Sequence, residues 1–309
     1  MRIFIAKNNL LITLIISLLS FSTYAEEAAQ GNPESSGAIQ LTWVGCGITK
    51  KAFMNELAAA FSQESGIQIN IQGGGATRGI RETAAGKVDM GGSCRYKMES
   101  SDLEKGAILK PVAWDALVVI THPDNKVNNI TLDQLRGVLE GRITNWKQLG
   151  GSDSNIKLFA REGKMSGVGR TLRKLVFANY NKEFEASQFF KSSGPLEAAV
   201  EKDKDAIAIT GISSARKLKA KILQLEGKTP DYQNIVNGSY ILYRPLYLAV
   251  NAAGKNAKVV DSFYKFTHSP KGKNILRDNG AVPYLDALSL VMKQVEQDER
   301  AMGRGVYRN

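Results

Sequence analysis

The chain has 309 residues, of which 43% are hydrophobic and 23% are charged, a composition that excludes a wholly disordered, collagen-like or disulfide-dense protein. This length is enough for one large domain or two ordinary ones. Its 41 basic and 30 acidic residues give a net charge of +11, which fits an anionic ligand, an anionic membrane surface or nucleic acid without selecting one of them.

The first 25 residues have the pattern of a signal peptide. Arg2 and Lys7 precede a short apolar run, Leu10–Leu19, and the small residues that a signal peptidase reads end at Ala25. We therefore expect cleavage after Ala25, which leaves an exported protein with a net charge of +9. The alternative is an uncleaved membrane anchor, but the apolar run is shorter than the ~20 residues that span a bilayer.

Beyond a polar stretch at 26–37, which predicts a flexible leader, strands and helices alternate. Apolar residues at every second position predict strands at 39–43 and 67–71. Between them we expect a helix capped by Thr49, because apolar residues recur after it at four-residue spacing. Residues 77–85 are expected to form the next helix. Glycine-rich turns stand at 45–47, 73–75 and 91–92.

This alternation is typical of an α/β domain with a parallel or mixed sheet. In such sheets, ligands bind beyond the carboxyl ends of the strands, where the N-termini of helices point. The glycine-rich turns occupy that position and are candidate ligand loops. The alternative interpretation is that these glycines only permit tight turns.

A second unit is expected to begin near Trp114. Its predicted elements are strands at 116–120, 156–159, 206–209 and 240–250, a helix opened by the capping box 131–134, and a helix after the loop 161–167. Ser269 and Pro270 then start a late helix that ends at Gly280. Residues 287–302 predict an amphipathic helix, to which the sequence assigns no role.

The cysteines and histidines favour neither a metal site nor a cofactor. Cys46 and Cys94 are too few for a cysteine-rich metal site, and His122 and His268 stand in no metal-ligand spacing. The chain also lacks a Ser-His-Asp order, a nucleotide-type phosphate loop and a GxGxxG turn. Catalysis is therefore poorly supported.

The turns instead carry the groups that bind a tetrahedral oxyanion: hydroxyls, backbone N–H groups at helix N-termini, and arginines. These residues are Thr49, Lys50, Thr77, Arg78, Cys94, Arg95, Arg161, Ser166 and Gly167.

Taken in order, these stretches resemble the phosphate-type substrate-binding proteins of bacterial ABC uptake systems, which are two-lobed periplasmic binding proteins. The resemblance covers about 39–284. The matching segments are 45–49, 73–78, 88–95, 141–146, 161–167, 240–247 and 269–283.

The resemblance implies an α/β, two-lobed Venus-flytrap fold with a hinge that the chain crosses twice. By this analogy lobe one comprises 38–115 plus 248–309, and lobe two comprises 116–247. It also implies a monomeric, non-enzymatic protein of the periplasm that binds no cofactor and no nucleic acid. Its partners would be inorganic phosphate or a similar oxyanion and an ABC permease in the inner membrane.

The family's ligand residues carry over position by position. Thr49 and the backbone of Lys50 would hold one side of the anion. From the residues themselves, we expect Arg161 to be the bidentate clamp from lobe two, with Arg95 supporting it from lobe one. Ala76 and Thr77 fall where the family uses hydroxyls, and Cys94 falls where many members have Asp or Ser. Residues Arg161, Ser166 and Gly167 would close from lobe two.

Two departures stand out: Ala76 lacks a hydroxyl, and Cys94 is not a carboxylate. The loop 165–170 also differs from the usual Gly-Ser-Gly-Thr-Arg, which leaves its register open by a residue or two. Phosphate is the first expected ligand and another oxyanion the second.

Two other functions remain open, a ligand-gated signalling or adhesion module on the same fold and an exported phosphate-ester hydrolase. Because Cys46 and Cys94 follow neighbouring strands, they can also form a disulfide in an oxidising compartment. The alternative is two small buried thiols that never meet.

Overall fold

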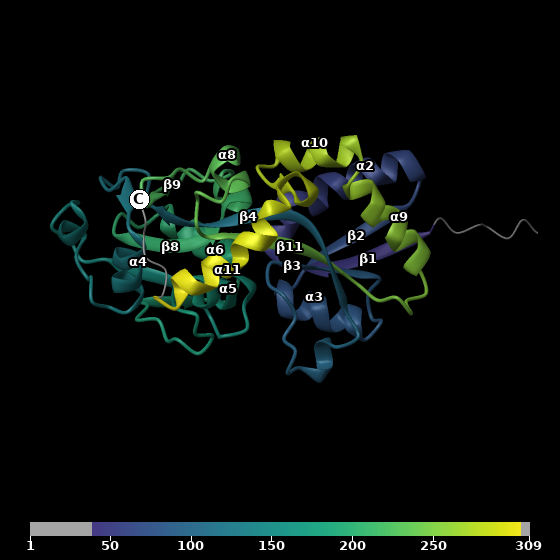
Figure 1. Ribbon diagram of the computed structural model, residues 1–309, viewed down its shortest axis with the longest axis horizontal. Helices are drawn as coiled ribbons and strands as arrows, with labels where there is room; N and C mark the ends of the chain where they lie inside the picture. The colour runs from purple at the N-terminus through teal and green to yellow at the C-terminus, as the bar shows by residue number, and fades with distance from the viewer. Residues whose placement is uncertain (1–38, 304–309) are drawn as a thin grey trace, which may run out of the picture. The chain divides into compact units, whose positions relative to one another are not determined.

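Residues 39–303 are described by a computed structural model (Figure 1). The expected signal peptide and leader, residues 1–37, lie outside the described residues. Between residues 39 and 303, none of the helices is both long and apolar enough to cross a lipid bilayer.

The first part of the chain alternates strands and helices as predicted. Its strands are β1 (Gln40–Gly45), β2 (Gln68–Gly73) and β3 (Met90–Ser93), and its helices are α1 (Gly47–Thr49), a π-helical turn (Lys50–Met54), α2 (Asn55–Ser65) and α3 (Gly75–Ala84). β1 pairs in parallel with both β2 and β3. The carboxyl ends of all three strands therefore lie at one edge of the sheet.

The first helix begins earlier than predicted, and Thr49 does not cap it. Cys46 is the N-cap: its backbone is extended, and its Sγ atom accepts a hydrogen bond from the Thr49 N–H at 3.4 Å. A thiol in this position replaces the oxygen that serine or aspartate supplies in most N-caps. The predicted cap was therefore three residues too late.

The second part of the chain contains the remaining helices and strands before residue 237. The strands are β4 (Ile108–Thr121), β5 (Asn129–Ile130), β6 (Lys157–Arg161), β7 (Gln188–Phe190), β8 (Ala206–Gly211), β9 (Lys221–Ile222) and β10 (Gln224–Leu225). The helices are α4 (Leu132–Leu139), α5 (Gly167–Phe177), α6 (Ser193–Val200), α7 (Ile212–Ala215) and α8 (Tyr232–Val236), with short 3-10 turns at Asp102–Glu104 and Trp146–Leu149. The capping box of Thr131 and Gln134 opens α4, as predicted.

The last part of the chain returns to the first strands. It consists of β11 (Tyr243–Val250), α9 (Ala257–Thr267), α10 (Pro270–Asp278), β12 (Val282–Pro283), a 3-10 turn (Tyr284–Ala287) and α11 (Ser289–Ala301). Ser269 caps α10 and Pro270 occupies its first turn, which confirms the predicted start of this helix.

Two long strands join the two groups of elements that Figure 1 shows on either side of β4 and β11. The strand order of the sheet is β2-β1-β3-β11-β4-β8-β6-β7. β4 pairs with β11 up to Ala116 and with β8 from Leu117 onward. This is the expected two-lobed α/β arrangement, in which the connecting strands are shared by both halves.

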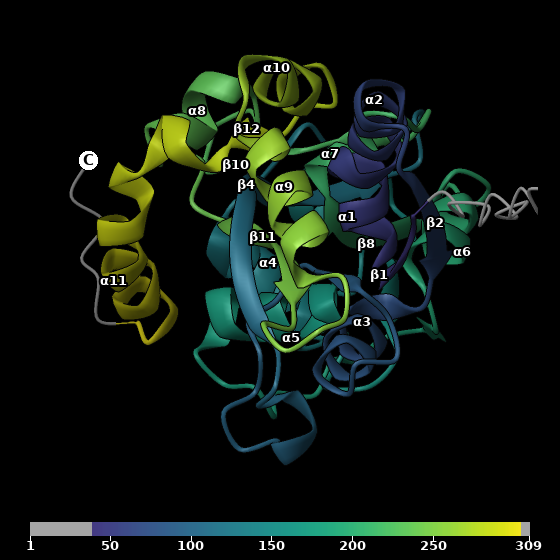
Figure 2. The same cartoon turned by 90° about the vertical axis from the view of Figure 1, so that its right-hand side faces the viewer.

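The C-terminal helix α11 lies apart from α9 and α10 (Figure 2) and contacts α5 instead. Lys174 of α5 pairs with Asp298 at 3.3 Å, and the Gln297 amide donates to the carbonyls of Ile241 and Tyr243. The predicted boundaries place residues 248–309 in lobe one, whereas this helix touches an element placed in lobe two. The exact lobe boundaries stay a prediction.

Candidate functional site

The site lies where the turns after β1 and β3 and the N-terminus of α3 meet the N-terminus of α5. Trp43 is fully buried beneath it, and a Cβ on Gly45 or Gly92 would come within 2.3 or 2.1 Å of its indole ring. These glycines are therefore required by the packing of Trp43. Glycine at these positions does not by itself indicate a ligand loop.

Thr49 and Lys50 lie beside Cys46 in the first helical turn. Thr49 is fully buried, and its Oγ1 donates to the Cys46 carbonyl at 3.0 Å and lies 3.3 Å from the Cys46 Sγ. The Lys50 N–H donates to the same carbonyl at 3.0 Å. Both predicted donors are thus engaged within the turn itself, and the Cys46 thiol stands at the end of the helix where an anion would be attracted.

Ala76, Cys94 and Gly167 meet at the centre of the site. Ala76 and Cys94 are 2% and 1% exposed, and a Cβ on Gly167 would lie 2.4 Å from the Cys94 Sγ and 3.1 Å from the Ala76 Cβ. Only glycine allows α5 to approach these two side chains so closely. The structure therefore brings together three of the predicted residues, from the turn after β3, from α3 and from α5.

Ser166 is the N-cap of α5, and its Oγ accepts from the Gly169 N–H at 3.1 Å. Among residues 39–303, the structure gives the N–H groups of Gly167 and Val168 no hydrogen-bond acceptor. Two free N–H groups at a positive helix end can bind an anion oxygen. Val168 was not predicted from the sequence, because its own side chain offers no polar group.

Arg161, at the end of β6, presents a partly free guanidinium to the site. One nitrogen donates to the Lys191 carbonyl at 2.6 Å, another lies 3.5 Å from the Ser193 Oγ, and the Nε is buried without a partner among the described residues. Burial lowers the pKa of Arg161, while the negative forms of Cys94 and Cys46 act in the opposite direction. Arg161 therefore lies within electrostatic range of both cysteines.

Arg95 and Thr77 are already engaged with other groups of the protein. Arg95 is 3% exposed and forms a double ion pair with Glu104, at 2.7 and 2.9 Å. Thr77 accepts from Arg95 at 3.0 Å and donates to the Met165 carbonyl at 3.0 Å. These two residues therefore join the α3 region to the loop before α5, and they offer little to an anion.

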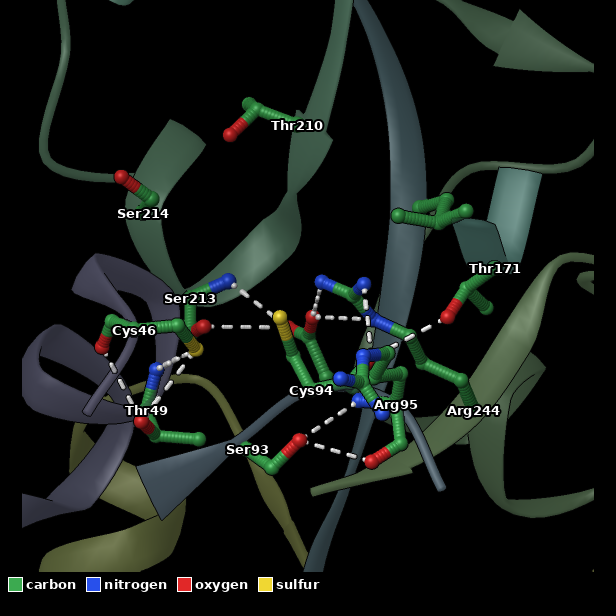
Figure 3. A network of polar contacts seen from close by, with 12 residues as sticks. Cys46, Thr49, Ser93, Cys94, Arg95, Thr171, Thr210, Ser213, Ser214 and Arg244 are labelled. Atoms are coloured by element: carbon green, nitrogen blue, oxygen red, sulfur yellow. Dashed lines mark hydrogen bonds and ion pairs between the residues drawn. The ribbon is translucent and has the colours of Figure 1, made fainter. Parts of the chain in front are cut away.

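A second buried arginine, which the sequence did not single out as a ligand residue, supports the floor of the site. Arg244 on β11 pairs with Asp115 at 3.0 Å and donates to the Cys94 carbonyl at 3.2 Å (Figure 3). Asp115 in turn accepts from the Ser213 N–H and hydroxyl. Arg244 belongs to the 240–247 segment, which was the signal that could have indicated it.

Lys51 and Glu197 form a further contact between the two halves of the chain. The Lys51 Nζ lies 2.8 Å from one Glu197 oxygen, and the other oxygen accepts from Thr210 at 2.5 Å and Ser214 at 2.7 Å. Glu197 is 1% exposed. A buried carboxylate needs this full set of partners, since each missing one leaves charge desolvated and unpaired.

The two cysteines are free thiols, so the disulfide that the sequence left open is absent from this structure. Figure 3 shows their side chains close together at the centre of the network. Burial alone would raise the pKa of Cys46, but hydrogen bonds with Cys94 and Thr49 and the charge of Arg244 lower it to about 6. The hydrogen bond to Cys46, together with burial, raises the pKa of Cys94 well above its usual value.

Negative charge on Cys46 is stabilised at the N-terminus of a helix, which is the physical situation that an anion ligand also uses. The arrangement can therefore hold one negative group between α1 and α5. Over residues 39–303, no group of three or more His, Cys, Asp or Glu side chains is placed to hold a metal ion.

Residues 30–271 match the family model described as a PBP superfamily domain. The phosphate-binding protein PstS of Borreliella burgdorferi is 30% identical to this chain over 192 residues, which cover 59% of this chain and 68% of that protein. PstS of Bacillus subtilis is 24% identical over 262 residues, covering 84% of this chain and 85% of that protein.

A similar solved structure is that of a Clostridium perfringens protein, assigned as the substrate-binding protein of a phosphate ABC transporter and crystallised with bound phosphate. It superposes with a TM-score of 0.72 at 25% identity, and the match covers 79% of this chain and 99% of that one.

Proposed function

Because the chain belongs to the PBP superfamily, we propose that it is an exported substrate-binding protein that captures a tetrahedral oxyanion, phosphate first, between its two lobes. In this role it delivers the anion to an ABC permease of the inner membrane and performs no catalysis. The names of its relatives and the phosphate in the Clostridium perfringens structure support this ligand.

The observation that carries the proposal is the N-terminus of α5. Among residues 39–303, the N–H groups of Gly167 and Val168 have no acceptor, and the buried Nε of Arg161 has no partner. Unpaired buried donors of this kind are stabilised by an anion that accepts from them. The same helix end lies against Cys94 and Ala76, so an anion held there would contact both lobes.

The contacts between the lobes support closure around the ligand. Thr77 binds the Met165 carbonyl, and Lys51 pairs with Glu197, in each case linking a residue of predicted lobe one to a residue of predicted lobe two. These bonds would form as the lobes close and would add to the affinity for the anion. The proposed lobe boundaries remain 38–115 plus 248–309 and 116–247.

Ala76 and Cys94 stand where the family has hydroxyl or carboxyl side chains. These replacements predict a lower affinity for the anion or a different preferred anion. Each lost hydrogen-bond partner of a dehydrated anion costs ~1–3 kcal/mol, which is about tenfold or more in affinity. The thiols also add negative character beside the anion when Cys46 is ionised. We therefore place phosphate first and a larger or less basic oxyanion second.

Export follows from the first 25 residues in this proposal: cleavage after Ala25 releases a monomer into the periplasm. N-terminal sequencing of the exported protein tests this part by itself. A mature chain that begins at Glu26 supports it, and retention of Met1 in a membrane fraction contradicts it.

The ligand is tested by titration calorimetry of the chain from Glu26 onward with phosphate, sulfate and molybdate. We expect saturable binding of phosphate and a rise in melting temperature, because a ligand at a hundredfold excess over its Kd stabilises the folded state by about 2.7 kcal/mol. If sulfate or molybdate binds and phosphate does not, the assigned ligand changes but the oxyanion-binding role stands. Binding of none of the three would overturn the proposed function.

A further inference from the structure

A second cavity, separate from the helix end at Gly167, lies on the other side of Cys94. Its volume is about 700 Å³, and it is an open pocket lined by the loop 95–100, α5, β11 and α11. Pockets for small organic molecules typically measure ~300–1,000 Å³. The volume is far more than a tetrahedral oxyanion fills, so the proposed function does not account for this cavity.

Aromatic rings form much of the wall. The lining includes Tyr96, Tyr180, Tyr243 and Tyr247. Tyr96 and Tyr180 are 52% and 40% exposed, and the rings of Tyr96 and Tyr247 meet edge to face with their centroids 5.7 Å apart. Exposed tyrosine rings around a cavity offer flat apolar surface to a planar ligand.

One guanidinium in the wall, that of Arg170, has no acidic partner among the described residues, while the ammonium group of Lys97 donates to the Ala107 carbonyl. The Arg170 guanidinium lies 3.9 Å from the centre of the Tyr180 ring, and between residues 39 and 303 its side chain has neither an ion pair nor a hydrogen bond. The two other arginines of the wall are neutralised, Arg95 by Glu104 and Arg244 by Asp115. Arg170 is therefore the guanidinium available to a ligand carboxylate, sulfonate or phosphate.

The cavity contacts both halves of the molecule. The loop 95–100 follows β3, whereas Arg170 and Thr171 belong to α5, and the Thr171 hydroxyl donates to the Cys94 carbonyl at 3.1 Å. Arg244 donates to the same carbonyl from β11. A ligand in the cavity would contact all of these elements and hold them together.

We propose that this cavity is a second ligand site, which binds a small aromatic anion with its ring against Tyr96 and Tyr247 and its negative group at Arg170. The helix α11 contributes Gln294 and Gln297 to the wall of the site. This proposal does not rest on the identity of the oxyanion bound at α5.

The test uses anilinonaphthalene sulfonate, an aromatic sulfonate whose fluorescence rises on binding, with the chain from Glu26 onward. We expect one saturable site. Arg170→Ala should weaken binding about tenfold through loss of a charge-assisted contact. Tyr96→Ala should weaken it through loss of the ring, whereas Tyr96→Phe should retain it. Melting curves check that each variant is folded.

Two controls locate the probe. Arg142→Ala removes an exposed arginine elsewhere and should leave its affinity unchanged. Met292→Gln changes the exposed apolar face of α11, where Met292 is 77% exposed, and should also have no effect. The proposal is overturned if Met292→Gln abolishes binding while Arg170→Ala and Tyr96→Ala do not, or if no saturable binding occurs.

The second site can be tested independently of the proposed oxyanion site at α5. Arg161→Ala and saturating inorganic phosphate should leave the probe's affinity within about twofold of that of the unchanged chain, because neither acts at Arg170. One-for-one displacement of the probe by phosphate would place the probe in the oxyanion site and would reject a second site. If phosphate fails to bind but the probe behaves as expected, the second site stands and the oxyanion role falls.

Discussion

Gly167 lies directly against Cys94: a Cβ at Gly167 would come within 2.4 Å of the Cys94 Sγ. This contact joins the first turn of α5 to the end of β3, so the missing side chain of one residue makes room for the thiol of the other. The closeness of the two halves at the proposed oxyanion site depends on it.

The first prediction concerns this contact. Gly167→Ala should reduce oxyanion affinity at least tenfold, because the added methyl group cannot coexist with the Cys94 thiol while α5 stays in place. Cys94→Ala in the same chain should recover part of the loss, since it removes the clashing atom. Calorimetry measures both.

Gly194→Ala is the matched control, because a Cβ at Gly194 meets no atom within 4 Å. It should bind like the unchanged chain. If Gly167→Ala also binds normally, the closed contact between α5 and Cys94 is not part of the liganded state.

The second prediction concerns Arg161. Arg161→Lys keeps the positive charge but loses the planar fork and the buried Nε–H, so phosphate affinity should fall about tenfold or more. Arg142→Lys, which changes an exposed arginine of the same half, should have no effect. Retention of affinity within a factor of two in Arg161→Lys would exclude Arg161 as the clamp.

The third prediction concerns acid stability. Burial opposes ionisation of Glu104, but hydrogen bonds from Arg95 and the Met98 N–H hold its pKa below the ordinary value of 4.5. A carboxylate with a depressed pKa contributes stability above its unfolded pKa and loses it as the pH falls through the folded value. Glu104→Gln should therefore be less stable at neutral pH and lose less stability below pH 4.5.

Urea unfolding at a series of pH values measures this difference. Asp102→Asn is the control, because the Asp102 side chain is 86% exposed and its pair with Lys105 lies at the surface, where ion pairs contribute little. The free energy of unfolding of Glu104→Gln, plotted against pH, could instead run parallel to that of the unchanged chain through the acid range. That result would show that the buried pair of Arg95 and Glu104 does not drive acid unfolding.

The fourth prediction concerns the cysteines. The structure holds both as free thiols, buried at 6% and 1% exposure. We expect an alkylating reagent to modify neither in the native protein and both after denaturation without reductant. Mass spectrometry counts the added groups. A mature chain that takes up no alkyl group in denaturant would instead contain the disulfide that the sequence left open.

Much of the architecture was predictable because it depends on neighbours in the sequence. The alternation at 39–43, the capping box at Thr131 and the proline after Ser269 act within one or two turns of backbone, and all three elements are present. The first helix was placed too late because a cysteine thiol is an uncommon N-cap, and the pattern favoured Thr49.

The roles of the charged residues were not predictable in the same way. The sequence indicated Arg95 as an anion ligand, but the loop that follows brings Glu104 to it and neutralises its charge. It did not select Arg244, whose partner Asp115 is 129 residues away in the chain. Which donors are left free for an anion depends on which others find partners within the protein.

The sequence by itself determined the alternating α/β elements and the ordered motifs that indicate the family. Only the tertiary structure decided that the Cys94 thiol fills the space beside Gly167, that Arg161 keeps a donor without a partner among residues 39–303, and that α11 lines a second cavity. The physical reason is range: backbone preference and periodicity act between residues a few positions apart, whereas packing and charge pairing are set by residues that the fold brings together from distant parts of the chain.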